Sequence, residues 1–591
     1  MSEEASKLPK DIAAAEGKVN VQINGTWHRF PRGTRIADAC RSVGVPIPCF
    51  CYHPKLAVAG SCRMCMVEQG MPPRLAPGQT PSYDENGYQR IQWMPRPIIS
   101  CANTVAENMG IRTDSPLASE ARRGVMEFLL TSHPLDCPIC DQAGECKLQE
   151  NSNDYGQVEG RFEEKKTKKG KNLSIGPRVN LDQERCVLCG RCVRFMRDIM
   201  HDEVLTMSQR GTFNAITVYP GRELDSNYSM NTVDLCPVGA LTSKDFRFKM
   251  RVWFLKETKT IDVDCGTGTN ITLWTREDKV YRITPRQNDA VNSCWMPDSH
   301  RLNYKYINAE TRIPQPVIRG FPRGEDAQPV IRTDAEAPHR PSTWEPALAS
   351  AAEAVKRIAP NQLAIIASGR MTNEELYMVR HLAAQIGTDM VDIVPRMGES
   401  DGMLISADRN PNTNGARLVL DIEPGSKLDA IREGVRSGSI KGILSLGEDL
   451  ISPEAGFTAE DLDKLDYLFM TAHSANETAR HADLVLPGVT YAEKFGTMIN
   501  VTGRIQRLNR AIQPIGYARD DWQIFRDITL LLGGNPALKD FNSALDILTA
   551  MSTEYGALNG VSWGSIGDGG QPILETGVTI PVVEREKNQG R

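Results

Sequence analysis

Cysteine placement constrains this chain more than any other feature of its sequence. Thirteen of the fifteen cysteines lie before residue 240, and none follows Cys294. Several are spaced as Cys-x-x-Cys, which suits metal ligation better than an ordinary disulfide bridge. We therefore expect the first 250 or so residues to fold around metal centres, with zinc and iron-sulfur clusters as the two candidates.

The overall composition is that of a globular protein with several domains. The chain has 591 residues, of which 40% are hydrophobic and 24% charged, enough for about three to five domains with cores of their own. The formal charge of -5 gives no argument for binding nucleic acid or an anionic membrane. No stretch is long and apolar enough to span a bilayer, and the first residues resemble neither a signal peptide nor a transit peptide. We expect a cytoplasmic-side protein that reaches a membrane only through partners.

The first cysteine set follows a predicted hairpin and helix. The segment VNVQINGTWHRF begins with alternating apolar and polar residues and contains Asn24-Gly25, the favoured dipeptide of a two-residue hairpin turn; residues 34–43 are predicted to be helical. This order is that of a ubiquitin-like ferredoxin domain. Three close thiols and one distant thiol resemble a plant-type [2Fe-2S] site, whose predicted ligands are Cys51, Cys62, Cys65 and Cys101.

Two alternatives remain open at this set. Zinc is the other possible occupant, although zinc sites usually pair two Cys-x-x-Cys knuckles. Cys49 competes with Cys51 as the first ligand; the family resemblance described below favours Cys51. Cys40 and Cys49 are then interpreted as small buried hydrophobic residues.

The second set follows the segment SEARRGVMEFLLTS, which is predicted to be helical. The string HPLDCPICDQAGECKLQE supplies one imidazole and three thiols, and the predicted [4Fe-4S] ligands are His133, Cys137, Cys140 and Cys146. A lone histidine is more often a core or surface residue, but this one closely precedes three cysteines. A neutral ligand in place of a thiolate should raise the cluster potential.

The third set is the most specific. ERCVLCGRCVRF and DLCPVGAL together form the Cys-x2-Cys-x2-Cys pattern with a remote Cys-Pro that is typical of bacterial ferredoxins. There is no second copy of the motif, so the remote cysteine should close the same cluster. The predicted [4Fe-4S] ligands are Cys186, Cys189, Cys192 and Cys236.

Five strings, taken in order, resemble the large iron-sulfur subunit of NADH-quinone oxidoreductase, respiratory complex I. They are FCYHP, AGSCRMC, HPLDCPICDQAGECKLQ, RCVLCGRCVRF and DLCPVGAL. The resemblance implies an electron-transfer subunit in the peripheral arm, on the cytoplasmic side of a bacterial inner membrane. It also implies two sets of partners: a flavin- and NADH-binding subunit with its small [2Fe-2S] subunit, and the iron-sulfur subunits that lead to quinone. NAD-linked hydrogenases and formate dehydrogenases have similar N-terminal segments and are the alternatives, with a zinc-stapled scaffold as a further one.

From about residue 259 the sequence alternates between strand and helix patterns, which predicts a doubly wound α/β region. Predicted strands are QLAIIAS, ARLVLDI, KGILSLG and DYLFMTA, and predicted helices include WEPALASAAEAVKRI and NEELYMVRHLAAQI. Residues 474–506 resemble the molybdopterin oxidoreductase fold. The residues that match its defining string are Glu493, Gly496, Thr497, Asn500, Gly503, Arg504 and Gln506.

The same region lacks residues that an active molybdopterin enzyme with its own cluster would carry. In DVDCGTGTN and CWMPD, Cys265 and Cys294 remain, but Asp262 and Thr269 occupy the other two thiolate positions and Met296 replaces a lysine. We expect neither molybdopterin nor a fourth cluster there. No complete dinucleotide-binding or P-loop motif is present, so we expect NADH to bind a partner and no independent substrate site in this chain.

These patterns predict five segments. They are a flexible tail (1–17), a [2Fe-2S] ferredoxin-like domain (18–110), a [4Fe-4S] segment with one histidine and three cysteine ligands (111–160), a [4Fe-4S] domain with four cysteine ligands (161–258) and a molybdopterin-oxidoreductase-like domain without cofactor (259–591).

Overall fold

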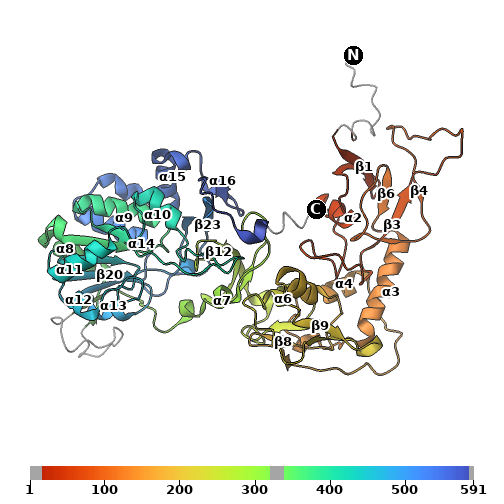
Figure 1. Cartoon of the computed structure of the whole chain (residues 1–591), viewed down its shortest axis with the longest axis horizontal. Helices are drawn as coiled ribbons and strands as arrows, with labels where there is room; N and C mark the ends of the chain where they lie inside the picture. The colour runs from red at the N-terminus through yellow and green to blue at the C-terminus, as the bar shows by residue number, and fades with distance from the viewer. Residues whose placement is uncertain (1–12, 14–15, 320–338, 585–591) are drawn as a thin grey trace, which may run out of the picture. The chain divides into compact units, whose positions relative to one another are not determined.

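The computed structural model describes residue 13 and residues 16–319 and 339–584. The chain forms two compact units, Met1–Trp253 and Phe254–Arg591 (Figure 1). Each unit has hydrophobic cores of its own. Most of the tail predicted for residues 1–17 lies outside the described residues. Among the described helices, none combines the length and the apolar character needed to cross a membrane.

The N-terminal unit begins with the predicted hairpin. Strands β1 (Lys18–Ile23) and β2 (Thr26–Pro31) pair antiparallel. Between them, Asn24 has φ 46° and Gly25 has φ 90°, the left-handed conformations that a two-residue turn of this type requires. Helix α2 (Ile36–Ser42) follows within the predicted range. The sequence predictions for the hairpin and for this helix are confirmed.

A mixed sheet completes the ferredoxin-like part. Its strand order is β2-β1-β6-β3-β4, with β1 and β6 parallel and β5 paired to β3. Apolar residues of β1 pack against α2 in one buried cluster, which covers one face of the sheet. The remaining strands of this sheet are β3 (Met66–Met71), β4 (Gln92–Trp93), β5 (Ile98–Ile99) and β6 (Met109–Arg112).

Short helices and small sheets form the rest of this unit. Helix α3 (Pro116–Ser132) is capped by Ser115, whose side chain accepts a hydrogen bond from the Ala118 backbone N–H at 3.3 Å, with proline in the first turn. The further elements are η2 (Cys137–Ile139), α4 (Lys147–Tyr155), β7 (Leu173–Ser174), β8 (Val179–Leu181), α5 (Arg191–Arg194), η3 (Phe195–Ile199), β9 (Leu205–Ser208), η4 (Gly211–Phe213), β10 (Ala215–Val218), α6 (Asn231–Leu235) and β11 (Leu241–Ser243).

A seven-stranded sheet organises the C-terminal unit. Its order is β16-β15-β21-β20-β19-β17-β18, and the neighbours from β21 to β18 are parallel. Alternate residues of β17 enter two separate apolar clusters, Ile365 in one and Ile366 in the other. Both faces of the sheet are therefore buried, as in a doubly wound fold. The strands are β15 (Val317–Arg319), β16 (His339–Pro341), β17 (Leu363–Ala367), β18 (Val391–Ile393), β19 (Gly442–Leu446), β20 (Tyr467–Ala472) and β21 (Leu484–Pro487).

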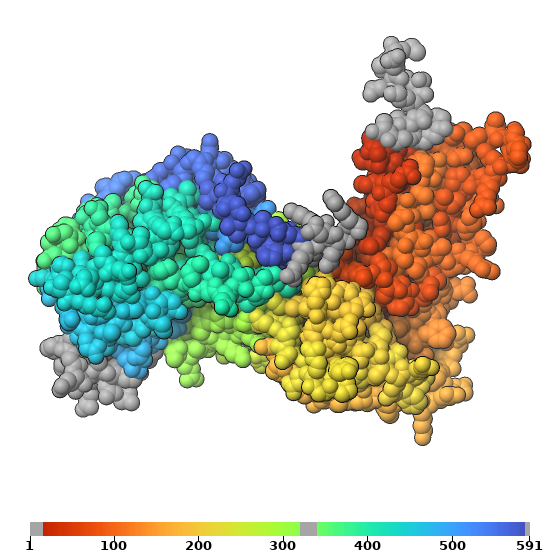
Figure 2. Space-filling view, in the orientation of Figure 1, coloured from red at the N-terminus to blue at the C-terminus, as the bar shows by residue number. Residues whose placement is uncertain are grey.

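Helices surround this sheet, and in the space-filling view the green and cyan part of the chain forms much of the visible surface of the unit (Figure 2). The helices are α8 (Trp344–Arg357), α9 (Asn373–Ile386), α10 (Thr413–Leu420), α11 (Leu428–Ser437), α12 (Ala459–Asp463), α13 (Glu477–His481), α14 (Asp521–Leu531), α15 (Ala544–Glu554) and α16 (Trp563–Ile566). Two smaller sheets consist of β12 (Lys256–Ile261), β13 (Asn270–Arg276) and β14 (Lys279–Pro285), and of β22 (Gly496–Ile499), β23 (Arg504–Leu508) and β24 (Gln571–Pro572).

One predicted strand is wrong. The segment ARLVLDI, residues 416–422, lies mainly in α10, and Asp421 ends this helix in the left-handed conformation at φ 55°. Ala416 and Val419 are fully buried three residues apart, which is a helical spacing. A short apolar run without clear alternation fits a buried strand and a buried helix equally well, and tertiary packing decides between them.

Candidate iron-sulfur centres

Each thiol of the first set makes a hydrogen bond with at least one other thiol of the set. Cys51 lies in the loop after α2, Cys62 and Cys65 immediately before β3, and Cys101 after β5. Hydrogen bonds to the thiols of Cys101 and Cys62 lower the pKa of Cys51, and a hydrogen bond to Cys101 lowers the pKa of Cys65 to about 6. The same contacts raise the pKa of Cys101. Four sulfur atoms linked in the order Cys62, Cys51, Cys101 and Cys65 form a donor set that fits a [2Fe-2S] cluster.

Backbone geometry keeps these loops close together. Ser100 donates two hydrogen bonds to the carbonyl oxygen of Cys65, from its backbone N at 3.1 Å and its Oγ at 2.9 Å. Gly60 has φ 63°, and a Cβ at this position would lie 3.1 Å from the Ile99 side chain. Because the position combines a positive φ with little space for a side chain, it favours glycine.

The position of Cys49 supports Cys51 as the first ligand. The Cys49 thiol donates to the carbonyl oxygen of Tyr52 at 3.7 Å, within its own turn. Cys51 instead contacts the thiols of Cys62 and Cys101. Cys49 is half-buried, which differs from the buried position predicted, whereas Cys40 is fully buried as expected.

The cysteines of the second set surround η2 and the start of α4. Cys137 begins η2, Cys140 follows it, and Cys146 precedes α4. Burial raises the pKa of Cys140 and that of Cys146. A Cβ at Gly239 would lie 2.4 Å from the Cys140 sulfur, so the Cys-Pro segment of the third set packs directly against the second.

His133 lies at the C-terminal end of α3, where its carbonyl oxygen accepts a hydrogen bond from Lys166 Nζ at 2.7 Å. Burial, with the charges of Arg185 and Lys166, lowers the pKa of His133 to about 4. The imidazole is therefore neutral at pH 7, the form that a metal ligand needs. Within the described residues its side chain makes no hydrogen bond or ion pair with a thiol, so ligation by His133 stays a prediction.

The four thiols of the third set line one small cavity. Its other walls are mostly apolar and include Leu181, Val187, Ile216, Val238, Ala240 and Leu241. Burial raises the pKa of Cys186 to about 12 and that of Cys189 to about 11. The backbone N–H of Leu188 donates to the Cys186 sulfur at 3.4 Å, and such bonds stabilise cluster ligands. A thiol-lined apolar cavity of this kind fits a [4Fe-4S] cluster.

One buried apolar cluster joins the three cysteine sets. It contains Cys51 from the first set, Cys146 from the second and Cys189 from the third. Its other fully packed members are Phe50, Met64, Met126, Leu148, Val238 and Ala240. The ligand sets are therefore parts of one packed structure.

Two arginines of α5 hold the first and third sets together. Arg194, only 7% exposed, donates to the carbonyl oxygens of Cys51 at 2.5 Å and Cys189 at 3.2 Å. Its guanidinium also bonds the carbonyl oxygen of Ala57. Arg191, one helical turn earlier, donates to the carbonyl oxygen of Tyr52 at 2.5 Å.

Arg185 joins the second and third sets. Its guanidinium pairs with Asp136 Oδ2 at 2.9 Å and with Asp182 Oδ2 at 2.8 Å, and Asp136 immediately precedes Cys137. Sequence reasoning missed these arginines because it considered only residues that could bind metal. Their position beside the cysteines in ERCVLCGRCVRF was the available signal.

In the C-terminal unit the remnant of a cluster motif is buried. Four residues of this remnant are each at most 4% exposed: Asp262, Cys265, Thr269 and Met296. The Cys265 thiol donates to the carbonyl oxygen of Leu404 at 3.7 Å. A carboxylate and a hydroxyl thus occupy two positions where a cubane would need thiolates.

Residues of the molybdopterin-like string hold this loop in place. Asn500 Nδ2 donates to the carbonyl oxygen of Thr267, and Gln506 Nε2 to that of Gly268, both at 3.0 Å. Glu493, 1% exposed, accepts a hydrogen bond from Arg312 at 2.6 Å. These contacts give the string a structural role.

Five protein-family descriptions match the chain in order. They are a 2Fe-2S iron-sulfur cluster binding domain (residues 16–116), the NADH-ubiquinone oxidoreductase-G iron-sulfur binding region (122–161), the NADH-quinone oxidoreductase subunit 3 ferredoxin-like domain (176–242), the NADH-ubiquinone oxidoreductase NDSU1/NuoG-like 4Fe-4S domain (255–305) and molybdopterin oxidoreductase (405–529).

Curated relatives decide the family. The mitochondrial NADH-ubiquinone oxidoreductase 78 kDa subunit of Neurospora crassa is 30% identical over 90% of this chain and 82% of the relative. The chain belongs to this subunit family. An NADH-quinone oxidoreductase subunit of Rickettsia conorii is 29% identical over 86% of this chain and 87% of its own length. Among solved structures, an NAD+-reducing [NiFe]-hydrogenase chain in the H2-reduced state is 26% identical, with a TM-score of 0.32 over 40% of this chain and 91% of that chain.

Membership of this family of NADH-quinone oxidoreductase subunits confirms two predictions from the sequence. The fold combines an N-terminal ferredoxin-like domain, iron-sulfur segments and a molybdopterin-oxidoreductase-like α/β region. The function is that of an electron-transfer subunit of NADH-quinone oxidoreductase. No match favours the hydrogenase, formate dehydrogenase or zinc-scaffold alternatives over this function.

Proposed function

We propose that this chain relays electrons through one [2Fe-2S] and two [4Fe-4S] clusters. The [2Fe-2S] ligands are Cys51, Cys62, Cys65 and Cys101, and the ligands of the [4Fe-4S] clusters are His133, Cys137, Cys140 and Cys146 in one and Cys186, Cys189, Cys192 and Cys236 in the other. The observation that carries the proposal is the single apolar cluster that contains Cys51, Cys146 and Cys189. Three donor sets packed in one core suit transfer from site to site.

When bound, the clusters supply one-electron redox chemistry. The chain contributes burial, which keeps the Cys186 and Cys189 sulfurs out of water, and hydrogen bonds such as that from Leu188 to Cys186. Both influence the reduction potential of a bound cluster. Arg194 fixes the loops of two donor sets relative to each other through the carbonyl oxygens of Cys51 and Cys189.

The proposed electron donor is a flavin- and NADH-binding subunit with its small [2Fe-2S] subunit. The proposed acceptors are the iron-sulfur subunits of the quinone-connecting module. In this account, ion translocation takes place in other subunits of the complex. The chain lies in the peripheral arm, on the cytoplasmic side of a bacterial inner membrane.

The C-terminal α/β unit is proposed to be a scaffold with no molybdopterin, no cluster and no substrate site of its own. Asp262 and Thr269 at thiolate positions support this proposal, as does the structural role of Glu493, Asn500 and Gln506. The proposed domain limits are those derived from the sequence.

Electron flow through the assembled complex tests the function. Cys146→Ser should lower NADH-driven quinone reduction at least about tenfold, because the chain loses a [4Fe-4S] ligand. Reduction of ferricyanide, which takes electrons directly from the flavin, should stay unchanged. The matched control is Cys294→Ser in the C-terminal unit, which should retain both activities. Full quinone reduction by the Cys146→Ser complex would overturn the proposal.

A further inference from the structure

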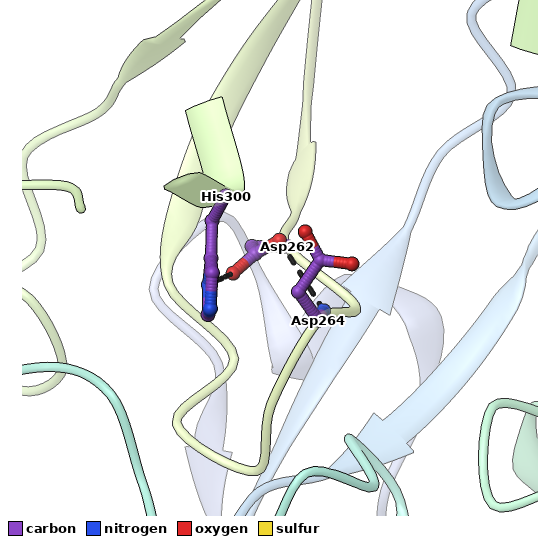
Figure 3. Close-up of side chains that lie close together, drawn as sticks. All are labelled: Asp262, Asp264 and His300. Carbon is purple, nitrogen blue, oxygen red and sulfur yellow. Dashed lines mark hydrogen bonds and ion pairs between the residues drawn. The ribbon is translucent and has the colours of Figure 1, made fainter. Parts of the chain in front are cut away.

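Three metal-ligating side chains converge in the C-terminal unit, outside the three cysteine sets. Asp262 and Asp264 follow β12, and His300 lies in the short helix α7 (Asp298–Arg301). One ligand atom from each residue lies within 4.8 Å of the other two. The His300 Nδ1 is 2.6 Å from Asp262 Oδ2, and the backbone N–H of Asp264 donates to Asp262 Oδ1 at 3.3 Å (Figure 3).

The nearby positive charges, Arg370 acting on Asp264 and Arg409 acting on His300, influence this cluster from a distance. Asp262 is 4% exposed and His300 8%. Within the described residues, neither aspartate forms an ion pair with a lysine or arginine; Asp262 pairs with His300, and Asp264 accepts from Asn303 Nδ2 at 2.7 Å. Two adjacent carboxylates, one buried and one half-buried, are costly together unless a cation offsets their charge. A bound divalent ion would offset this cost.

A buried hydroxyl belongs to Thr269, the residue that pairs with Asp262 through the backbone. The carbonyl oxygen of Thr269 accepts a hydrogen bond from the Asp262 backbone N–H at 2.8 Å. The Thr269 side chain is fully buried, and its Oγ1 has no hydrogen-bond partner in the part of the chain that the structure describes. A polar group left unpaired in this way costs about 1–3 kcal/mol. A metal-bound water would give it a partner.

A cavity with room for water contacts the residue between the two aspartates. A cavity of about 90 Å³ is lined by Val263, the residue between them, and also by Tyr306 and Arg370. One water occupies about 30 Å³ in the liquid. The cavity therefore has room for about three waters within one residue of the two aspartates.

We propose that Asp262, Asp264 and His300 bind one divalent first-row metal ion, with Zn2+ as the best match. One imidazole and two carboxylates suit such ions, whereas Ca2+ and Mg2+ prefer shells made of oxygen alone. Ligand atoms around tetrahedral zinc lie about 3.3 Å apart. The His300–Asp262 contact must therefore lengthen by less than about 1 Å when the metal replaces the shared proton. The site lies in the unit that holds none of the proposed clusters. The zinc proposal is therefore tested independently of the cluster proposal.

Metal analysis of the full-length chain tests the site. Protein purified anaerobically, equilibrated with micromolar ZnCl2 and desalted should retain about one zinc per chain besides its iron. Asp264→Asn and His300→Gln should each lower retained zinc about tenfold without changing the iron content. The matched control is His481→Gln, because His481 pairs with Asp463 at 2.8 Å outside this three-residue cluster. This variant should retain the zinc.

Zinc-edge X-ray absorption distinguishes this site from zinc bound to cysteines. The expected spectrum has nitrogen and oxygen ligands at about 2.0–2.1 Å and no sulfur shell near 2.3 Å. A sulfur shell, no retained zinc in the wild-type chain, or zinc unchanged in Asp264→Asn would each overturn the proposal. Asp264 is half-buried and asparagine is nearly isosteric, so this variant decides the matter if His300→Gln fails to fold, as judged by circular dichroism.

Discussion

Replacing Cys189 by serine is expected to lower the iron content of the full-length chain from about ten to about six atoms. It should also remove one [4Fe-4S] signal from the low-temperature paramagnetic resonance spectrum of the reduced protein. The reason is that Cys189 lines the cavity of the third set and is buried beside Cys186, Cys192 and Cys236. A neutral serine hydroxyl is a much poorer iron ligand than a thiolate.

Loss of this cluster should also loosen the surrounding segment, because cluster binding energy is partly folding energy. The matched control is Cys49→Ser, which removes a half-buried thiol whose partner is the Tyr52 carbonyl. The iron content of this control should stay at about ten atoms per chain. Unchanged iron content and an unchanged spectrum in Cys189→Ser would contradict the ligand assignment, and loss of two irons in Cys49→Ser would favour Cys49 over Cys51.

Arg194→Met should destabilise the contact between the first and third sets by about 2–4 kcal/mol. Methionine fills much of the same space but donates no hydrogen bond, so the carbonyl oxygens of Cys51 and Cys189 lose their arginine partner. About 2 kcal/mol corresponds to about thirtyfold in an equilibrium constant. The [2Fe-2S] signal should therefore disappear about thirtyfold faster when the reduced protein is challenged with an iron chelator.

Arg197→Met is the matched control for this experiment. Arg197 follows Arg194 by three residues but is half-exposed, and its ion pair is with the neighbouring Asp198 at 2.6 Å. Exposed pairs of this kind contribute about 0–1 kcal/mol, so the rate of signal loss should change little. Equal rates for Arg194→Met and Arg197→Met would show that Arg194 does not hold the two loops together.

Local patterns predicted much of the fold. Asn24-Gly25 forms the predicted turn because both residues readily adopt positive φ, and the helix predicted from NEELYMVRHLAAQI is α9, Asn373–Ile386. Helix α9 carries a capping box between Thr372 and Glu375, a signal that is visible in the sequence. Long elements with clear periodicity and end signals are therefore predictable from the chain alone.

Contacts between distant segments were not predictable in the same way. Arg194 reaches the carbonyl oxygen of Cys51, 143 positions earlier, and no local pattern encodes such a contact. The ARLVLDI segment failed as a strand because its short apolar run does not specify a period. The Asp262–His300 pair spans 38 positions, and no recognised metal-binding spacing links these two residues. Spacing indicated candidate ligands within each set, whereas only the fold shows how the sets pack together.

Metal and sulfide analysis of the anaerobically purified wild-type chain tests the central claim most directly. Three clusters on the proposed ligands predict about ten irons and an equal amount of acid-labile sulfide per chain, with no molybdenum. Because the proposed zinc site binds no iron, it does not alter this count. About fourteen irons, stoichiometric molybdenum, or zinc in place of iron at the cysteine sets would contradict the account.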